Sequence, residues 1–452
     1  MALLNKKQFA VSLLLNIARL VLALVLIASG FVKAVDPVGS MYKLQEYASA
    51  FSFTVSDDWT LFFAIILAAL EFLLGIFLVT GIYRRVVPLL TFVMFLCFTP
   101  LTLYIMLAGA VNDCGCFGDA VELDNDTTFY KNLVLLFLSF FVFWKRRRFT
   151  LYISSKNRWL VALFSLFYIS VLQGVGLSHL PVLDFRPYAV GNNLRELTQG
   201  TPDIYDIYYT CEKGGVQKEF LSTEYPDSSW AVLETRAEVA VQGNRPVIGD
   251  FEIIDWEYDY DIAGEILLDT GYVCLLAIET TEAASVSRVD KVNDLYDYCV
   301  ENDIPFYAAT SSADSAVVLW RKRTGAEYPI CWADATLLRT MIRSNPGLVL
   351  LKDGVIVGKW NVSDIPDVED FANSPTRMPD KLEVPFGAMR TPRFWFKWLL
   401  YPLLAIALID LMSAMLRRRR LKAAAKREKE NGEQPQCVDK ESQEVEQNVE
   451  KD

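Results

Sequence analysis

Six long apolar segments recur along the chain, and polar or charged residues separate each from the next. Each segment is long enough to cross the roughly 30 Å hydrocarbon core of a bilayer as a helix. Buried helices of a soluble protein would not account for the charges between the segments. The pattern therefore predicts a multi-pass α-helical membrane protein, with spans at residues 13–32, 60–80, 86–110, 128–144, 159–177 and 394–416.

Basic residues gather in alternate gaps between these spans, and Lys and Arg in short loops stay on the cytoplasmic side. The basic clusters lie at residues 6–7, 84–85, 145–148 and 417–420. The gap between the third and fourth spans instead carries acidic residues and no basic residue. We therefore expect a protein of the inner membrane with both termini cytoplasmic and with residues 179–393 on the outer side.

The long segment between the fifth and sixth spans has the pattern of a folded α/β domain. Residues 203–220 alternate around a Gly214-Gly215 turn, which predicts a β-hairpin. Beyond it, buried-strand patterns alternate with amphipathic helices. Strands are predicted at residues 271–278, 304–310 and 328–332, helices at 287–301 and 335–343, and an antiparallel pair at 347–360.

These elements define the expected domains. The tail after residue 416 is rich in Glu, Gln and Lys and has no apolar periodicity, so it should be disordered in the cytoplasm. The predicted parts are a four-helix membrane domain (1–148), a fifth span (149–178), a segment containing the hairpin (179–247), an α/β domain (248–375), a sixth span (394–416) and the tail (417–452).

Composition fits this division and excludes several functions. Hydrophobic residues make up 52% of the chain, yet 22% is charged, as expected when membrane spans and a sizeable soluble part share one chain. The net charge of −11 argues against nucleic-acid binding. The cysteine spacings give no zinc pattern, and His179 is the one histidine, which excludes a histidine-rich metal centre.

Cys114 and Cys116 lie between the third and fourth spans, on the expected outer face. A disulfide between thiols one residue apart closes a small, strained ring that should be readily reduced, and Gly115 gives it backbone freedom. Asp113 and Asp119 act against reactivity, because nearby negative charge disfavours the thiolate. A redox pair, a static disulfide or turn joining the two spans, and a metal ligand pair all remain open.

The first and second predicted spans each contain a charged residue, which is costly there unless it is paired or faces a polar cavity. One hypothesis is that Arg19 and Glu71 pair and line a pocket for a small lipophile such as a quinone. The alternative for Arg19 is that its guanidinium extends to the nearby cytoplasmic interface. Glu71 lies near mid-span, where this is impossible, and is the better functional candidate.

The first four spans resemble known families. The run from Arg19 through Ala28-Ser29-Gly30-Phe31 to Asp36-Pro37 is similar to the opening of the DoxX family, and the run from Glu71 to Gly81 to its second helix. The Asp113-Cys-Gly-Cys-Phe-Gly-Asp119 loop resembles the related MauE proteins. Over residues 10–148, the resemblance implies a four-helix membrane bundle and, for MauE, a role in thiol–disulfide handling.

The α/β domain resembles thioredoxin over residues 248–372. Pro346 matches the cis-proline that opens a strand in that fold, which implies a cis Asn345–Pro346 bond. Residues 279–285, where thioredoxin carries its Cys-x-x-Cys, contain no cysteine, and the remaining thiol candidate is Cys331. The domain therefore resembles a docking module rather than an active thioredoxin. Its candidate binding residues are Pro346 and Cys331, and the candidate binding residue of the membrane domain is Glu71.

Two functions follow. In the first, Cys114 and Cys116 relay electrons between an envelope client protein with thiols and a lipid-soluble acceptor such as a quinone. In the second, the protein is a non-enzymatic assembly, transport or lipid-binding factor whose outer domain docks a client. The first requires both loop cysteines, and the second tolerates their loss.

Overall fold

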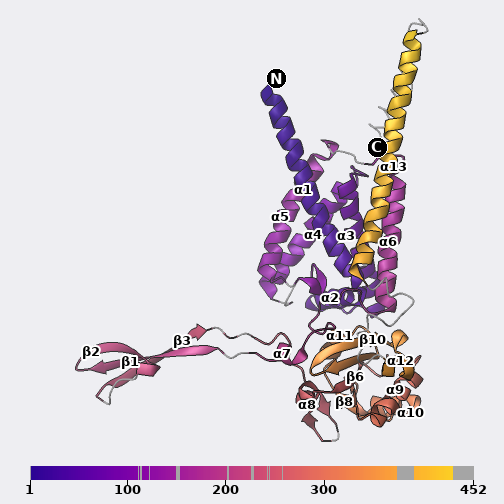
Figure 1. Ribbon diagram of the computed structural model, residues 1–452. Coiled ribbons are helices and arrows are strands. Elements are labelled where there is room, and N and C mark those ends of the chain that lie inside the picture. Colours follow the sequence, from indigo (N-terminus) through magenta and orange to yellow (C-terminus); the bar gives the residue numbers. More distant parts are fainter. Residues whose placement is uncertain are drawn as a thin grey trace. The chain divides into compact units, whose positions relative to one another are not determined.

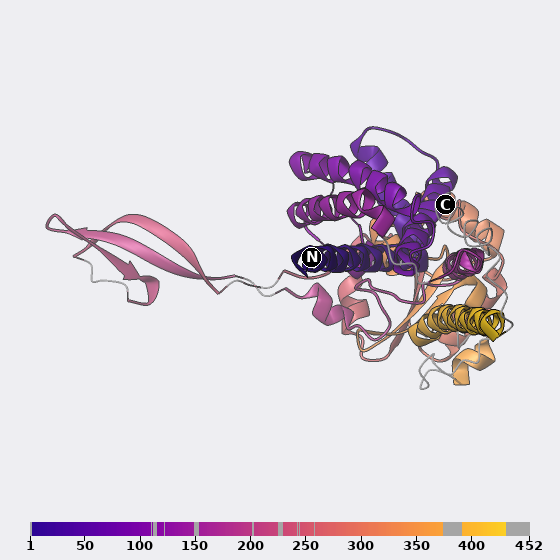
Figure 2. The same ribbon diagram turned by 90° about the horizontal axis from the view of Figure 1, so that it is seen from above.

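The computed structural model divides the protein into two compact units, a membrane unit of Met1–Leu183 with Glu383–Asp452 and a soluble unit of Asp184–Leu382 (Figures 1 and 2). We describe each unit by itself. The residues described are 2–109, 111, 115–121, 123–148, 153–200, 203–224, 229–241, 243, 245–256, 258–373 and 391–430. Residues 417–430 of the predicted disordered tail are helical, contrary to the prediction, and the rest of the tail lies outside the described residues.

Within the described residues, six helices are long and apolar enough to cross a membrane, and all six predicted spans fall on them. This confirms the multi-pass fold. Their outward faces carry exposed leucine, valine and phenylalanine side chains, as a lipid-facing surface requires. The helices are α1 (Ala2–Val35), α3 (Asp57–Thr80), α4 (Val87–Ala108), α5 (Asn125–Trp144), α6 (Arg158–Ser178) and α13 (Pro392–Glu430).

Helices α1 and α3 approach each other closely at two glycines. A Cβ atom on Gly30 of α1 would lie 2.4 Å from the backbone nitrogen of Phe72 and 2.7 Å from the carbonyl oxygen of Ala68. A Cβ atom on Gly75 of α3 would lie 2.8 Å from the backbone nitrogen of Ile27. Small residues permit such backbone approach, and close packing is a main source of helix association in membranes.

A helix that the sequence reading did not predict, α2 (Pro37–Ala50), follows α1. Its start has a proline at the first position and a cap in which the Asp36 carboxylate accepts a hydrogen bond from the backbone N–H of Gly39 at 2.8 Å. Its apolar content is too low for a span, so hydropathy alone did not reveal it.

Helix α13 packs on α6 through aromatic rings and one buried carboxylate. The hydroxyl of Tyr168 donates to the carbonyl oxygen of Trp395 at 3.1 Å. Asp410 accepts hydrogen bonds from the backbone and hydroxyl of Ser154 and, at 2.7 Å, from the side-chain amide of Asn157. Hydrogen bonds therefore hold α13, the sixth span, to residues 154–157, which directly precede α6.

The soluble unit contains a seven-stranded sheet in the order β10-β9-β6-β7-β8-β4-β5. Strand β7 is parallel to both of its neighbours, β6 and β8, and β9 is antiparallel to β6. This arrangement and the cis Asn345–Pro346 bond confirm the thioredoxin-like prediction. The strands are β4 (Ile254–Asp255), β5 (Tyr260–Asp261), β6 (Tyr272–Ile278), β7 (Phe306–Thr310), β8 (Ile330–Trp332), β9 (Gly347–Lys352) and β10 (Val355–Asn361).

Helices pack against this sheet. The two predicted helices correspond to α9 and α11. Helix α10 and the short strand pair β4–β5 were not predicted. The apolar core lies between the sheet and α9, α10 and α12. The helices are α7 (Leu194–Thr198), α8 (Ala263–Leu268), α9 (Val289–Glu301), α10 (Asp314–Thr324), α11 (Ala335–Met341) and α12 (Val368–Asn373).

The predicted hairpin forms as β1 (Ile204–Lys213) and β2 (Val216–Leu221), joined through Gly214 and Gly215. Both glycines have positive φ, as the two-residue turn requires. A third strand, β3 (Ala231–Val241), pairs with β1 and completes a separate sheet in the order β2-β1-β3.

Replacing Gly30 by alanine should destabilise the membrane unit by about 1–3 kcal/mol, because the added methyl group overlaps the backbone of α3. Gly174→Ala in α6 is the matched control: no atom lies within 4 Å of its Cβ position, so alanine should be neutral or stabilising by up to about 1 kcal/mol. Thermal unfolding in detergent measures both. Equal midpoints for the two variants would contradict the close α1–α3 crossing.

Candidate functional site

Cys116 lies in a tight turn at one end of the helical bundle. Gly115 and Gly118 have φ values of 55° and 53°, and the N–H of Gly118 donates to the carbonyl oxygen of Gly115 at 3.0 Å. Positive φ favours glycine, which explains why glycine suits both positions of this turn. Cys114 and Asp113 lie outside the described residues.

Contacts on both sides fix this turn to the bundle. The ammonium of Lys131, on α5, lies 4.7 Å from the ring centre of Phe117, within the range of a cation–π interaction. The side-chain amide of Asn125, at the start of α5, donates to the carbonyl oxygen of Val111 at 2.7 Å. The turn after α4 is thereby attached to α5.

The third attachment joins the turn to a buried ion pair. The Ser29 hydroxyl lies 2.6 Å from the carbonyl oxygen of Cys116 and 2.7 Å from Oε2 of Glu71. The ammonium of Lys33 lies 2.7 Å from Oε1 and 2.9 Å from Oε2 of the same carboxylate. The side chain of Glu71 is only 2% exposed and that of Lys33 12%, so each charge depends on the other for neutralisation.

The predicted pairing of Arg19 with Glu71 is wrong, because Glu71 instead contacts Lys33 and Ser29. Arg19 precedes Ser29 by ten residues, or about 15 Å along the helix. Arg19 is also buried, at 3% exposure, rather than extended to the interface. The choice of Glu71 as the better candidate agrees with its position beside the Cys116 turn.

Ser29 links the carboxylate of Glu71 to the backbone of the turn. A hydroxyl group has one hydrogen and two lone pairs. It can therefore donate fully to either the carboxylate or the Cys116 carbonyl, but not to both. Any change in the charge of Glu71, or in the position of Cys116, changes which of the two receives the hydrogen.

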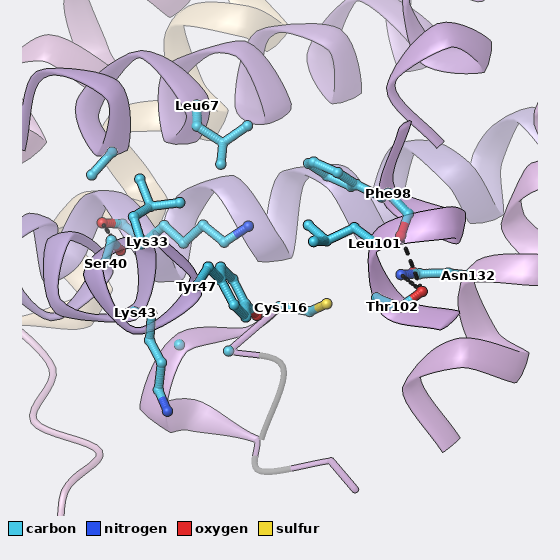
Figure 3. A pocket seen from close by; sticks show the side chains of 14 residues that line it. Lys33, Ser40, Lys43, Tyr47, Leu67, Phe98, Leu101, Thr102, Cys116 and Asn132 are labelled. Carbon is cyan, nitrogen blue, oxygen red and sulfur yellow. Dashed lines mark hydrogen bonds between the residues drawn. The ribbon is translucent and has the colours of Figure 1, made fainter. Parts of the chain in front are cut away.

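Cys116 also borders a cavity of about 90 Å³ within the membrane unit. Figure 3 shows its sulfur pointing into the space between the ring of Tyr47 and the side chains of Leu101 and Thr102. The walls are mostly apolar, with Lys33 at one side. The lining residues are Lys33, Ser40, Lys43, Leu44, Tyr47, Ala64, Leu67, Phe98, Leu101, Thr102, Gly115, Cys116, Gly118 and Asn132.

Helix α2 forms one wall of this cavity. Four of its residues line the cavity at spacings of three and four, which place them on one helical face. They are Ser40, Lys43, Leu44 and Tyr47. The sequence reading missed these residues because it did not predict α2. It also missed Ser29 and Lys33 as partners of Glu71, although their i, i+4 spacing at the end of a span was a usable signal.

In the soluble unit, residues 279–285 lie beside Pro346, as the thioredoxin resemblance implied. The side-chain amide of Asn345 donates to the carbonyl oxygen of Thr280 at 2.8 Å, and the N–H of Ser285 donates to the carbonyl oxygen of Asn345 at 3.0 Å. Glu282 is exposed on this edge, and its hydrogen bond from Ser312 lowers the pKa of its carboxyl group.

Cys331 lies away from that edge. It is on β8, which β6 and β7 separate from β9, so about 14 Å of sheet lies between Cys331 and the strand that Pro346 precedes. Its side chain is fully buried, and burial, with a smaller effect of Asp255, raises the pKa of the thiol to about 12. A thiol in this state is protonated at neutral pH and a poor nucleophile.

Comparison with protein families decides the class of the membrane unit: residues 11–145 match the family model described as "Methylamine utilisation protein MauE". The membrane domain is MauE-like. The match includes the MauE-like Cys116 turn, Ser29, Lys33, Glu71 and every residue that lines the cavity. The resemblance to DoxX stays a prediction.

A search of curated proteins found no match. Among solved structures, "Solution structure of a putative protein disulfide isomerase from Bacteroides thetaiotaomicron" is 18% identical. The match covers 27% of this chain and 79% of the chain in that structure, with a TM-score of 0.22. A likeness at this TM-score does not bear on the fold, which the strand order of the soluble unit defines.

Replacing Glu71 by glutamine should cost about 3–5 kcal/mol of stability, because the Lys33 ammonium stays buried without its carboxylate. Lys33→Met should cost a similar amount, and Lys33→Met with Glu71→Leu should cost less than either. Glu46→Gln is the control, since its pair with Lys43 is partly exposed and should contribute less than about 1 kcal/mol. The free energy of unfolding is measured in detergent. An equal loss for Glu71→Gln and Glu46→Gln would contradict the buried ion pair.

Proposed function

We propose that this MauE-like protein carries out thiol–disulfide exchange at the outer face of the inner membrane through Cys114 and Cys116. In this proposal the cavity beside Cys116 receives an apolar electron acceptor, a quinone. The soluble thioredoxin-like domain docks the client protein whose thiols are oxidised. The alternating basic clusters support this orientation, because six spans return both ends of the membrane unit to one side.

The observation that carries the proposal is the environment of Cys116. Its sulfur points into a largely apolar cavity that Lys33 and Lys43 also line. The thiolate is the nucleophile in disulfide exchange, so a sulfur that opens on a cavity is placed to react with a molecule bound there. An apolar wall at the end of the bundle suits a lipid-soluble ligand. A static disulfide would need neither feature.

The proposed exchange balances as follows. A client thiolate attacks the Cys114–Cys116 disulfide and forms a mixed disulfide, and the second client thiol then releases the loop as a dithiol. The client has lost two electrons and two protons and gained one disulfide. The quinone takes two electrons and two protons from the loop dithiol, which restores the loop disulfide and leaves a quinol.

A role of the soluble domain in docking is supported by its thioredoxin-like edge. Residues 279–285 provide no thiol there, while Glu282 and Ala283 are exposed beside Pro346. The buried, protonated Cys331 fits the same division of labour. The domain would bind the client, and the loop of the membrane unit would supply the exchanging cysteines.

Single serine variants test the exchange itself. Cys114→Ser and Cys116→Ser should each accumulate a mixed disulfide between the surviving cysteine and a client protein, because the second thiol that resolves it is missing. Non-reducing gels of cells treated with N-ethylmaleimide measure this. Cys331→Ser is the control and should trap nothing. Normal function of the double variant Cys114→Ser with Cys116→Ser would favour the non-enzymatic assembly, transport or lipid-binding role instead.

A cavity-filling variant tests the acceptor. Leu101→Trp should block the cavity and slow oxidation of the reduced loop by ubiquinone-1 by about tenfold or more, equivalent to about 1.4 kcal/mol. Leu103→Trp on the same helix is the control, because Leu103 faces outward and does not line the cavity. Stopped-flow or gel-based measurement of loop thiols after quinone addition gives the rates. Equal rates for both variants would argue against a quinone in this cavity.

A further inference from the structure

Two cysteines of the soluble unit meet in its core. Cys274 lies on β6 and Cys299 on α9, and their sulfur atoms are 3.7 Å apart. Both side chains are buried, at 1% and 0% exposure, among the apolar residues that join the sheet to the helix. The other described cysteines of this unit, Cys211 on β1 and Cys331 on β8, lie on other strands.

A separation of 3.7 Å is van der Waals contact between two sulfur atoms. A disulfide requires about 2.05 Å, which is a shift of less than about 2 Å shared between two side chains. Rotation about the Cα–Cβ bond of each cysteine moves its sulfur atom, so small rotations about these two bonds can supply most of this shift.

We propose that Cys274 and Cys299 form a disulfide when the soluble unit folds on the outer side of the membrane. Both thiols lose their protons and together give up two electrons. The oxidant is the disulfide of a thiol–disulfide exchange protein, which leaves as two thiols. Because both sulfurs are inaccessible in the folded unit, the exchange takes place before α9 closes over β6. The proposal goes beyond the role of Cys114 and Cys116 and does not depend on it.

This disulfide acts on the docking edge. The chain between the two cysteines contains residues 279–285, which lie against Asn345 and Pro346. Cys274 is on β6, before this loop, and Cys299 is near the end of α9, after it. A covalent bond between them limits how far the loop can open. The bond would therefore stiffen the thioredoxin-like edge at the position where a thioredoxin carries its reactive pair.

Mass spectrometry of the full-length protein tests the bond directly. Thiols are blocked with N-ethylmaleimide in the producing cells and again under denaturing conditions, and the membranes are digested without reductant. We expect a linked peptide pair that contains Cys274 and Cys299, and N-ethylmaleimide on Cys331. N-ethylmaleimide on both Cys274 and Cys299 would overturn the proposal.

Stability gives a second and independent measurement. Reductant should lower the unfolding midpoint of the soluble unit in the full-length protein by roughly 5 °C or more, the size expected for loss of a native disulfide. The double variant Cys274→Ala with Cys299→Ala should not respond to reductant, whereas Cys331→Ala should respond as the wild type does. A wild-type midpoint that reductant leaves unchanged would contradict the bond.

Discussion

The buried carboxylate of Glu71 has to be neutralised inside the membrane unit, and the crossing of α1 and α3 supplies the groups that do so. Gly30 has no side chain, so α1 approaches the backbone of α3 at Ala68 and Phe72, on either side of Glu71. That approach brings Ser29 and Lys33, which precede and follow the glycine on α1, within hydrogen-bonding distance of the carboxylate. The ion pair therefore depends on helix packing, and the packing depends on the absence of one methyl group.

The position of the Cys116 turn follows from the same crossing. Ser29 contacts both the carboxylate and the Cys116 carbonyl, so the turn is attached to a buried charge of the unit. Lys33 serves twice, since it neutralises Glu71 and lines the cavity into which the sulfur points. The Cys116 turn is thus held through its backbone, and under the proposed function such a group is preorganised rather than dependent on movement of a loop. The cation, the thiol and the apolar wall are consequences of one packing arrangement.

Much of this arrangement could be read from the sequence, and the parts that could not share a physical cause. Spans of twenty apolar residues, the Gly214-Gly215 hairpin and the Pro346 strand all depend on local patterns, and the structure agrees with them. Helix α2 is short and only partly apolar, so neither length nor hydropathy marked it. The partner of Glu71 depends on which turn of α1 faces it; the spacing of Ser29 and Lys33 hints at this turn, and the contact at Gly30 decides it. The position of Cys331 depends on strand order, which spacing along the chain does not specify.

The soluble unit places its cysteines where a thioredoxin does not. At its edge beside Pro346, Asn345 donates a hydrogen bond to the backbone carbonyl of Thr280, and Ser312 donates one to the carboxylate of Glu282. The cysteines lie instead within the core, where Cys274 and Cys299 meet and Cys331 is protonated by burial. A buried thiol contributes packing and linkage, whereas an exposed one contributes reactivity. The described cysteines of the thioredoxin-like scaffold are thus placed for packing, and in our proposal the thiol chemistry of the chain belongs to the Cys116 turn of the MauE-like domain.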